Sequence, residues 1–327
     1  MYKAKVAFMT PYPEDEMRPL MDAAPLEFFV FHVDNRLPTE AKIPLVRDAD
    51  FVMLMPADIT VDLVRACPNL KLVQLFAAGY DRIDVKTISG LGVPVATNGG
   101  SNATAVAEFV VTLMLTLYKR FVPIVRGVAE GKWTADQWRS SHDLEGKTVG
   151  IVGLGTIGRK VAARLRGFDV ELLGHTRSHV PEQTAKELGI RITTFEELLE
   201  KSDVVTLHVP LTPETRGFVG EREFAMMKGS ALLINTSRGA IVDEAALYDA
   251  LRCRKIAGAG LDVLVKEPMT PDNPLRNLDN VVITPHIASC TLDSRIQCAL
   301  FAYENMKRVL QGKEPLAVVK AAGEIPG

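Results

Sequence analysis

Short apolar runs alternate with amphipathic stretches from the first residues of the chain onward. Each short run predicts a strand, and the stretches between them, with apolar residues three or four positions apart, predict helices. In the first hundred residues the expected strands are Val6–Met9, Phe28–Phe31, Phe51–Met55, Leu72–Leu75 and Val93–Thr97, and the expected helices lie near Glu14–Ala23, Glu40–Asp48, Val61–Ala66 and Asp84–Gly90. This alternation is typical of a parallel sheet covered by helices.

A long helix follows, from Ala103 to about Gly127, with Asn102 or Thr104 as its N-cap. Six further strands are then expected, at Val149–Val152, Val170–Gly174, Val204–His208, Ala231–Asn235, Ala257–Val263 and Val281–Thr284. The helices between them are expected near Pro181–Leu188, Glu196–Lys201, Glu221–Met226 and Glu244–Arg252, and a final helix at Leu292–Leu310. Six strands suit a doubly wound dinucleotide-binding fold.

A glycine-rich turn joins the first of these six strands to a helix. The turn reads Gly153-Leu-Gly155-Thr156-Ile157-Gly158, and apolar residues recur four positions apart after it. In such a turn the first glycine permits a tight bend, the second lets a pyrophosphate approach the backbone, and the third lets the helix pack on the strand. The free N–H groups of the helix then face the anion. The sequence therefore predicts a dinucleotide site here.

The length of 327 residues exceeds what one core usually serves, so we expect two domains. The glycine-rich turn places the dinucleotide-binding Rossmann domain at residues 102–291. We expect the last helix to return to the first domain, so that the substrate domain is discontinuous, at residues 1–101 and 292–327. The predicted fold class is α/β, with two Rossmann-like or flavodoxin-like domains built on doubly wound parallel sheets.

Composition excludes several classes of function. The net charge is −2 and no basic patch suits a phosphate backbone, so nucleic acid is not an expected partner. The first residues predict a strand and not a signal peptide, and the longest apolar run, Ala105–Leu117, contains Glu108 and is too short to cross a bilayer. The four cysteines lack metal-binding spacing, so we expect no metal site and buried thiols in a reducing, cytoplasmic compartment.

Three later strands each end in polar residues that suit hydride-transfer chemistry. They bring Arg238, Glu267 and His286 to the edge of the sheet where ligands of open α/β sheets bind. A histidine can exchange a proton with the substrate oxygen, and a carboxylate on its far nitrogen orients the ring. An arginine can bind a carboxylate and polarise the neighbouring carbonyl.

These segments together resemble the D-isomer-specific 2-hydroxyacid dehydrogenases over nearly the whole chain. The matching segments, in order, are Asn98-Gly-Gly-Ser-Asn-Ala-Thr-Ala-Val-Ala-Glu108, the glycine-rich turn, His208-Val-Pro-Leu-Thr-Pro-Glu-Thr215, Asn235-Thr-Ser-Arg-Gly-Ala-Ile-Val-Asp243, Ala259-Gly-Leu-Asp-Val263 with Glu267-Pro, and Thr284-Pro-His-Ile-Ala288. The family includes glyoxylate/hydroxypyruvate reductases, D-lactate dehydrogenase and phosphoglycerate dehydrogenase.

The resemblance implies a role for each matched residue. Arg238, Glu267 and His286 would be the catalytic residues, with Arg238 and His286 also touching the substrate. Backbone N–H groups at Ala78 and Gly79 would bind the substrate carboxylate, and Asn102 would touch substrate or nicotinamide. Phe76 and Met53 are either side-chain selectors or core residues. The implied cofactor contacts are Val106, Gly153, Gly155, Thr156, Ile157, Gly158, Thr176, Arg177, Ser178, His208, Val209, Pro210, Thr215, Thr236, Ser237 and Asp262, the last beside the nicotinamide carboxamide.

The residues after the second strand of the dinucleotide domain bear on the choice of cofactor. An NAD enzyme of this fold carries Asp or Glu there to bind the ribose 2′-OH. Thr176 occupies that place, followed by Arg177 and Ser178, which suit a 2′-phosphate. We therefore expect NADP(H) to be preferred, with NAD(H) as the alternative.

The expected function is NAD(P)H-dependent reduction of a small 2-keto acid, glyoxylate or hydroxypyruvate, to the D-2-hydroxy acid. One alternative is a formate- or phosphite-type dehydrogenase; formate dehydrogenases of the superfamily have Gln where Glu267 stands, which argues against it. Another is a nicotinamide-binding scaffold like the corepressors of the superfamily, which retain the catalytic residues. The family also implies a homodimer, with the helix from Ala103 as the expected contact surface.

Overall fold

The computed structural model describes residues 2–320 and divides them into two compact units. Unit 1 comprises residues 2–102 and 290–320, and unit 2 comprises Ala103–Ser289. The predicted boundaries, after residue 101 and before residue 292, stand one and two residues from these. Residues 1 and 321–327 of the predicted substrate domain lie outside the described range. The chain thus enters unit 1, forms all of unit 2, and returns.

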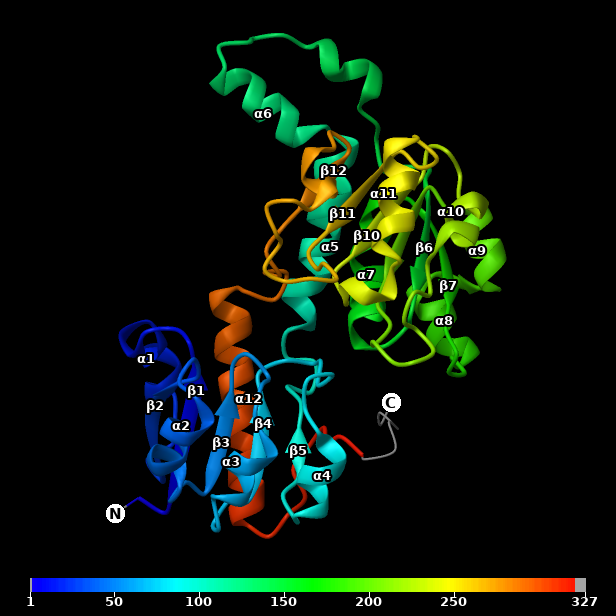
Figure 1. Ribbon diagram of the computed structural model, residues 1–327. Helices are drawn as coiled ribbons and strands as arrows, with labels where there is room; N and C mark the ends of the chain where they lie inside the picture. The colour runs from blue at the N-terminus through cyan, green and yellow to red at the C-terminus, as the bar shows by residue number, and fades with distance from the viewer. Residues whose placement is uncertain (1, 321–327) are drawn as a thin grey trace. The chain divides into compact units, whose positions relative to one another are not determined.

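Unit 1 is built on a five-stranded parallel sheet in the order β2-β1-β3-β4-β5 (Figure 1). The strands are β1 Ala4–Thr10, β2 Phe28–Asp34, β3 Phe51–Leu54, β4 Leu72–Leu75 and β5 Val95–Ala96. β3 and β4 are buried along their whole length, as expected of parallel strands covered on both faces. The strand order reverses between β1 and β3, which makes that point the place where a ligand crevice is expected.

Helices cover both faces of this sheet. α2 Thr39–Val46, α3 Val61–Arg65 and α4 Val85–Gly90 pack on one face, and α1 Glu14–Asp22 and α12 Leu292–Leu310 pack on the other. Tyr303 of α12 is fully buried and donates its hydroxyl to the carbonyl oxygen of Leu20, 2.9 Å away. The return of the last helix to the first domain is therefore confirmed. Met53 and Phe76, expected to be either side-chain selectors or core residues, both lie in this core.

Unit 2 contains a seven-stranded parallel sheet in the order β12-β11-β10-β9-β6-β7-β8. Its strands are β6 Thr148–Val152, β7 Glu171–His175, β8 Ile190–Ile192, β9 Val204–Leu207, β10 Leu232–Asn235, β11 Gly258–Leu261 and β12 Val281–Ile283. The prediction of six strands was wrong, because it missed β8, a short edge strand with two of its three residues exposed. The predicted α/β class with two doubly wound parallel sheets is confirmed.

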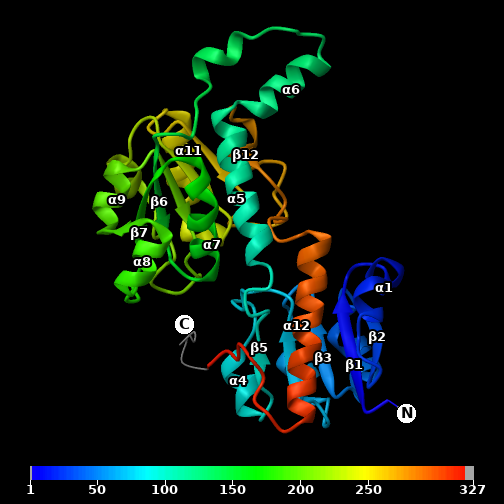
Figure 2. The same cartoon turned by 180° about the vertical axis from the view of Figure 1, so that it is seen from behind.

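Two helix layers enclose this sheet (Figure 2). α5 Ala103–Tyr118 and α7 Thr156–Leu165 cover one face, and α9 Phe195–Lys201, α10 Glu221–Met226 and α11 Glu244–Arg252 cover the other. α8 Glu182–Leu188 lies beside the edge strand β8, and short 3₁₀ turns lie at η1 Asp136–Ser140, η2 Arg166–Phe168, η3 Gly239–Ile241 and η4 Pro274–Asn277.

The predicted helix from Ala103 to about Gly127 is two helices. α5 ends at Tyr118, Arg120 adopts a left-handed conformation with φ of 52°, and α6 Phe121–Ala129 starts again in a new direction. The apolar pattern continued across this break, which is why the sequence did not reveal it. α6 and the segment after it project from unit 2, and α6 buries none of its residues (Figures 1 and 2).

Two of the four cysteines differ from expectation. Cys67 and Cys298 are buried as predicted, and burial raises the pKa of each thiol to about 11. Cys253 and Cys290 are exposed, so the prediction of buried thiols was wrong for them. Within residues 2–320, no helix combines the length and apolar character needed to cross a membrane. The same range holds no cluster of His, Cys, Asp or Glu side chains that could hold a metal ion.

Candidate active site

The glycine-rich turn between β6 and α7 has the geometry that a dinucleotide requires. Gly153 has φ of 96°, and a Cβ there would lie 2.6 Å from the carbonyl oxygen of His208. A Cβ on Gly158 would lie 2.0 Å from the carbonyl oxygen of Gly153, so only glycine lets α7 approach the strand this closely. A Cβ on Gly155 would meet no protein atom within 4 Å. Gly155 therefore borders open space at the start of α7, where a pyrophosphate would be bound.

The segment after β9 meets this turn, and the segment after β10 lies against the β9 segment. His208, Val209 and Pro210 follow β9 directly, and Val209 accepts a hydrogen bond on its carbonyl oxygen from the hydroxyl of Ser237, which follows β10. Thr215 donates its hydroxyl to the carbonyl oxygen of Pro210 at 2.6 Å, which closes the loop after β9. The structure thus brings the predicted contacts from three adjacent strand ends together, at the point in the sheet where strand order reverses.

The side chains of His208 and Thr236 differ in whether they have a hydrogen-bond partner. Burial lowers the pKa of His208 to about 3, so its ring stays neutral, and its Nε2 lies 3.0 Å from the hydroxyl oxygen of Thr206. The hydroxyl of Thr236 is buried and has no hydrogen-bond partner among the described residues. Because buried polar groups are rarely left unpaired, Thr236 fits a group supplied by a ligand. Gly155 and Thr236 together show that the residues present suit a dinucleotide.

The predicted 2′-phosphate residues follow β7. Thr176 is half-buried, and Arg177 and Ser178 are exposed. A hydrogen bond from Thr212 is the main cause that holds the pKa of Glu214 below its usual value, and the nearby charge of Arg177 adds to it. Arg177 therefore lies close to the loop after β9.

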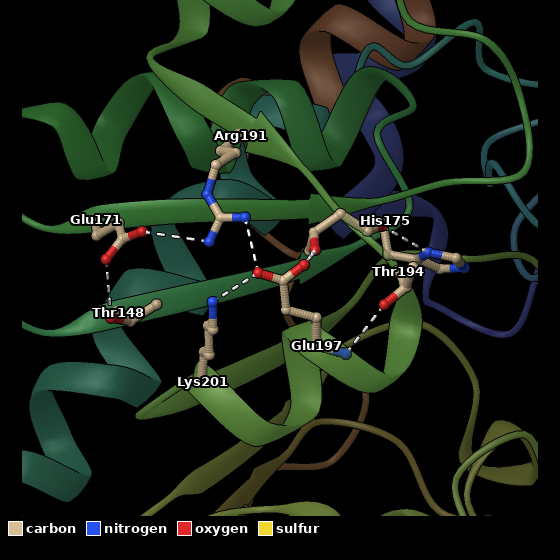
Figure 3. Close-up of polar contacts among 8 residues, drawn as sticks. Thr148, Glu171, His175, Arg191, Thr194, Glu197 and Lys201 are labelled. Carbon is tan, nitrogen blue, oxygen red and sulfur yellow. Dashed lines mark hydrogen bonds and ion pairs between the residues drawn. The ribbon is translucent and has the colours of Figure 1, made fainter.

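A polar network connects the end of β7 to β8 and α9 (Figure 3). His175 contacts the carbonyl oxygen of Thr193 through its Nδ1 at 3.2 Å, and Thr193 donates its hydroxyl to Glu197 of α9. Glu197 also accepts from Lys201 at 2.7 Å and Arg191 at 2.9 Å. These hydrogen bonds, that from Lys201 first, lower the pKa of Glu197 to about 2. The network ties edge strand β8 and the last residue of β7 to α9.

His286 and Glu267 form an ion-pair geometry after the ends of β12 and β11. The Nδ1 atom of His286 lies 2.8 Å from Oε2 of Glu267. The other carboxylate oxygen of Glu267 accepts a hydrogen bond from the backbone N–H of Leu264 at 3.0 Å. Because Glu267 engages one oxygen with the backbone and the other with Nδ1 of His286, the carboxylate orients the imidazole ring.

Asp262 holds the turn that carries His286. One of its carboxylate oxygens accepts from the Thr284 hydroxyl at 2.6 Å and the Ile287 N–H at 2.9 Å, and the other accepts from the Ala288 N–H at 2.8 Å. The N–H of His286 donates to the carbonyl oxygen of Asp262 at 2.9 Å. His286 has φ of 56°, a conformation that few side chains favour and that surrounding bonds must enforce. The expected place of Asp262 beside the nicotinamide stays a prediction.

The Arg238 loop lies directly against the loop that carries Glu267. A Cβ on Gly239 would lie 2.0 Å from the carbonyl carbon of Leu264, so the two backbones touch where glycine stands. Buried Asn235 donates its amide to the carbonyl oxygen of Arg238 at 2.9 Å and accepts from the N–H of Ser237 at 3.0 Å. The guanidinium of Arg238, half-buried, donates to the carbonyl oxygen of Ser237 at 2.7 Å. The three predicted catalytic residues thus come from adjacent strand ends of one sheet.

Sequence reasoning missed a further residue that positions Glu267. Glu244, the first residue of α11, accepts from the N–H of Val265 at 3.0 Å and from the side-chain amide of Asn273 at 2.9 Å. It therefore links both ends of the Glu267 loop to a helix. The one feature of the sequence that could have indicated this role is that Glu244 directly follows the matched segment that ends at Asp243.

The remaining predicted contacts are placed as follows. Val106 lies on α5 of unit 2 and is buried. In unit 1, Ala78 and Gly79 follow β4, and the N–H of Asn98 donates to the carbonyl oxygen of Ala77 at 3.2 Å. Asn102 is 8% exposed, and its side-chain oxygen has no hydrogen-bond partner in the described part of the chain. That oxygen therefore does not cap α5 and suits a ligand.

Comparison with known proteins gives consistent matches. Residues 111–288 match the family model described as D-isomer specific 2-hydroxyacid dehydrogenase, NAD binding domain. A glyoxylate reductase from Korarchaeum cryptofilum is 42% identical over 278 residues, covering 84% of this chain and 83% of that protein.

Two solved structures are similar over almost the whole chain. An acyclic imino acid reductase in complex with NADPH and D-Arg is 27% identical, with a TM-score of 0.82 and coverage of 97% of this chain and 100% of the other. A formate dehydrogenase from Granulicella is 26% identical, with a TM-score of 0.85 and coverage of 99% and 100%.

Proposed function

Because this chain belongs to the D-isomer-specific 2-hydroxyacid dehydrogenase family, and so is a nicotinamide-dependent oxidoreductase, we propose that it reduces glyoxylate or hydroxypyruvate to the D-2-hydroxy acid, with NADPH as the preferred cofactor. The observation that carries this proposal is the 2.8 Å contact between His286 and Glu267 beside the Arg238 loop. The glyoxylate reductase among its relatives supports the choice of substrate.

In the proposed mechanism, the residues bind, orient and protonate the keto acid. When bound, the reduced nicotinamide supplies the hydride that the keto carbon accepts. Protonated His286 donates from Nε2 to the carbonyl oxygen, and Glu267 stabilises the charged ring through Nδ1. Arg238 binds the substrate carboxylate and polarises the carbonyl. Backbone N–H groups at Ala78 and Gly79 also bind that carboxylate.

The stereochemistry of the product tests this function. The enzyme is incubated with NADPH and hydroxypyruvate, and the glycerate formed is resolved by chiral chromatography. We expect D-glycerate. L-glycerate would overturn the assignment. Cofactor binding without any product would favour the corepressor-like scaffold, and reduction of NADP⁺ by formate would favour the dehydrogenase alternative, against which the Glu267–His286 pair argues.

The proposed preference for NADPH rests on the residues after β7. No carboxylate stands among Thr176, Arg177 and Ser178 to bind a free 2′-OH, and Arg177 is exposed where a 2′-phosphate would be met. The NADPH complex of the similar imino acid reductase supports the same choice.

Replacing Arg177 by Ala is expected to raise the KM for NADPH by about tenfold to a hundredfold, the worth of one charged hydrogen-bonding partner, with little change for NADH. Steady-state kinetics with each cofactor measures this. Arg191→Ala is the matched control, because Arg191 is also an exposed arginine near this edge but is held by Glu197 at 2.9 Å. An equal rise for NADH, or none for NADPH, would contradict the proposed role.

We also propose that the protein is a homodimer, and that α6 and the segment after it form the contact. The expected surface, the helix from Ala103, packs most of its apolar residues inside unit 2. α6 and the segment after it instead expose several large apolar side chains, among them Phe121 of α6, Trp133 at 89% and Trp138 at 69%. Such a concentration of exposed apolar surface is typical of an interaction site. The cytoplasmic location stays a prediction.

Light scattering tests the dimer. At micromolar concentration we expect twice the mass of one chain, and a shift toward the monomer when Trp133 and Trp138 are both replaced by Ala, because aromatic residues dominate interface energetics. Leu26→Ala, at an exposed site of unit 1, is the control. A monomeric wild-type protein, or a dimer that the double replacement leaves intact, would refute this interface.

A further inference from the structure

The carboxyl ends of the strands of unit 1 meet at one edge of its sheet. Strand order reverses between β1 and β3, so the chain leaves these two neighbours in opposite directions and a crevice is expected outside their ends. Met9 pairs with Leu54 in this register, so the loops that carry Tyr12 and Pro56 leave β1 and β3 at the same edge. The loop with Ala78 and Gly79 follows β4, on the far side of β3.

Tyr12 is held in place by the strands beside it. Its N–H donates to the hydroxyl of Thr10 at 3.4 Å, and its carbonyl oxygen lies 2.9 Å from Nε2 of His32 in β2. Its ring supports an arginine: the guanidinium carbon of Arg295 lies 4.8 Å from the ring centroid, a cation–π geometry.

Arg295 comes to this edge from the first turns of α12. The ring of Phe301 lies against Gly99, just beyond the end of β5, and Cys298 accepts a hydrogen bond from Asn98 at 3.7 Å. Because these contacts already lie at the carboxyl edge, the turn that precedes them extends past the sheet. Figure 1 shows α12 beginning at that end and running back along the strands.

Arg295 has no acidic partner among the described residues, and its guanidinium donates no hydrogen bond to them. Arg36, which follows β2 at the same edge, is instead engaged by Asp34 at 2.7 Å, and that hydrogen bond lowers the pKa of Asp34 to about 2. Arg295 is also half-buried, which strengthens its pull on any anion that reaches it.

The buried side chains next to this edge, Met53 and Phe76, cannot bind the ligand in place of Arg295. Met53 is fully buried and Phe76 stacks on Phe8 with ring centroids 5.3 Å apart, so neither side chain is available to a ligand. Adjacent strands lie about 4.8 Å apart, which puts the loops after β1 and β4 about 10 Å apart. That spacing suits a three- or four-carbon acid with its C1 carboxylate at the Gly79 loop and its other end near Tyr12.

We propose that Arg295, supported by Tyr12, binds the oxygen-bearing substituent at C3 of the substrate and so selects 2-keto acids with a C3 hydroxyl or carboxylate over those with a hydrocarbon side chain. This inference rests on the proposed 2-keto acid reduction. The guanidinium donates charge-assisted hydrogen bonds to such oxygens and none to a methyl group. Glyoxylate has no C3 and provides an internal reference.

The test compares Arg295→Met with the wild-type enzyme, because methionine keeps an apolar stem over Tyr12. Steady-state rates are measured with glyoxylate, pyruvate, hydroxypyruvate and oxaloacetate. We expect the ratio of kcat/KM for hydroxypyruvate to that for glyoxylate to fall at least tenfold, mainly through KM, with a larger fall for oxaloacetate. Arg36→Met is the matched control and should keep the wild-type ratio. An unchanged ratio, or an equal loss with every substrate, would overturn the proposal.

A binding experiment separates this proposal from the proposed function. Calorimetric titration of D-glycerate and glycolate into the protein with NADP⁺ is expected to show D-glycerate affinity reduced at least tenfold in Arg295→Met, relative to glycolate. If no keto acid is reduced but this loss is seen, the proposed reaction fails and the subsite stands. If turnover is robust and D-glycerate affinity is unchanged, the subsite fails alone.

Discussion

Replacing His286 by Ala is expected to lower kcat for glyoxylate reduction by about a thousandfold, within the usual range for loss of a general acid. The carbonyl oxygen must gain a proton as hydride arrives, and His286 is the titratable group that Glu267 holds at 2.8 Å for that purpose. Dissociation of NADPH, followed by fluorescence, should change little, because the glycine-rich turn is left intact.

Two further variants make this expectation specific. His142→Ala is the control, because His142 is exposed and packs edge-on against Tyr118 on unit 2. Glu267→Gln keeps the acceptor for the Leu264 N–H but removes the charge, and we expect about a tenfold to hundredfold loss in kcat. A His286→Ala enzyme that retains a tenth of the wild-type kcat would refute the assigned role.

Replacing Gly155 by Ala is expected to abolish useful NADPH binding while leaving the fold intact. The added methyl group meets no protein atom within 4 Å, and the backbone φ of −73° suits alanine, so the free energy of unfolding should stay within about 1 kcal/mol of the wild type. The same methyl group would occupy the space where the pyrophosphate approaches. Loss of two charged hydrogen bonds there would raise the Kd by about a hundredfold or more.

Two other glycines near α7 provide the comparison. Gly158→Ala is expected to destabilise the protein by about 2–3 kcal/mol, because its methyl group would lie 2.0 Å from the carbonyl oxygen of Gly153. Gly167→Ala should change neither stability nor affinity, since it is exposed and a Cβ there meets nothing. Denaturant unfolding and NADPH titration measure both quantities. Unfolding of Gly155→Ala, or wild-type affinity in it, would contradict this account of the turn.

The regular elements were predictable where burial and periodicity agreed. α10, α11 and α12 have the predicted bounds, and β4 does as well. β8 was not predicted because its three residues, Ile190-Arg-Ile, are too few to show an apolar period, and because it lies at the edge of the sheet. The break between α5 and α6 at Arg120 was not predicted, because a left-handed residue other than glycine does not change the pattern of apolar positions.

The candidate site was predictable to the extent that motifs mark strand ends. Arg238, Glu267 and His286 were found because each follows a strand of the same sheet. The hydrogen bonds that position these residues could not be predicted, because they join residues far apart in the sequence. Glu244 accepts from the N–H of Val265, 21 residues later, and Asp262 accepts from the N–H of Ala288, 26 residues later. Arg295 also has no signature in the sequence, since its significance comes from Tyr12 nearby and from having no acidic partner within residues 2–320.

Initial rates of NADPH and NADH oxidation with glyoxylate, followed side by side at the absorbance band of the reduced nicotinamide, test the central claim most directly. The account predicts that both cofactors are consumed only when the keto acid is present, and that NADPH is consumed much faster. If both cofactors bind and neither is oxidised by glyoxylate or hydroxypyruvate, the protein is not the 2-keto acid reductase proposed here.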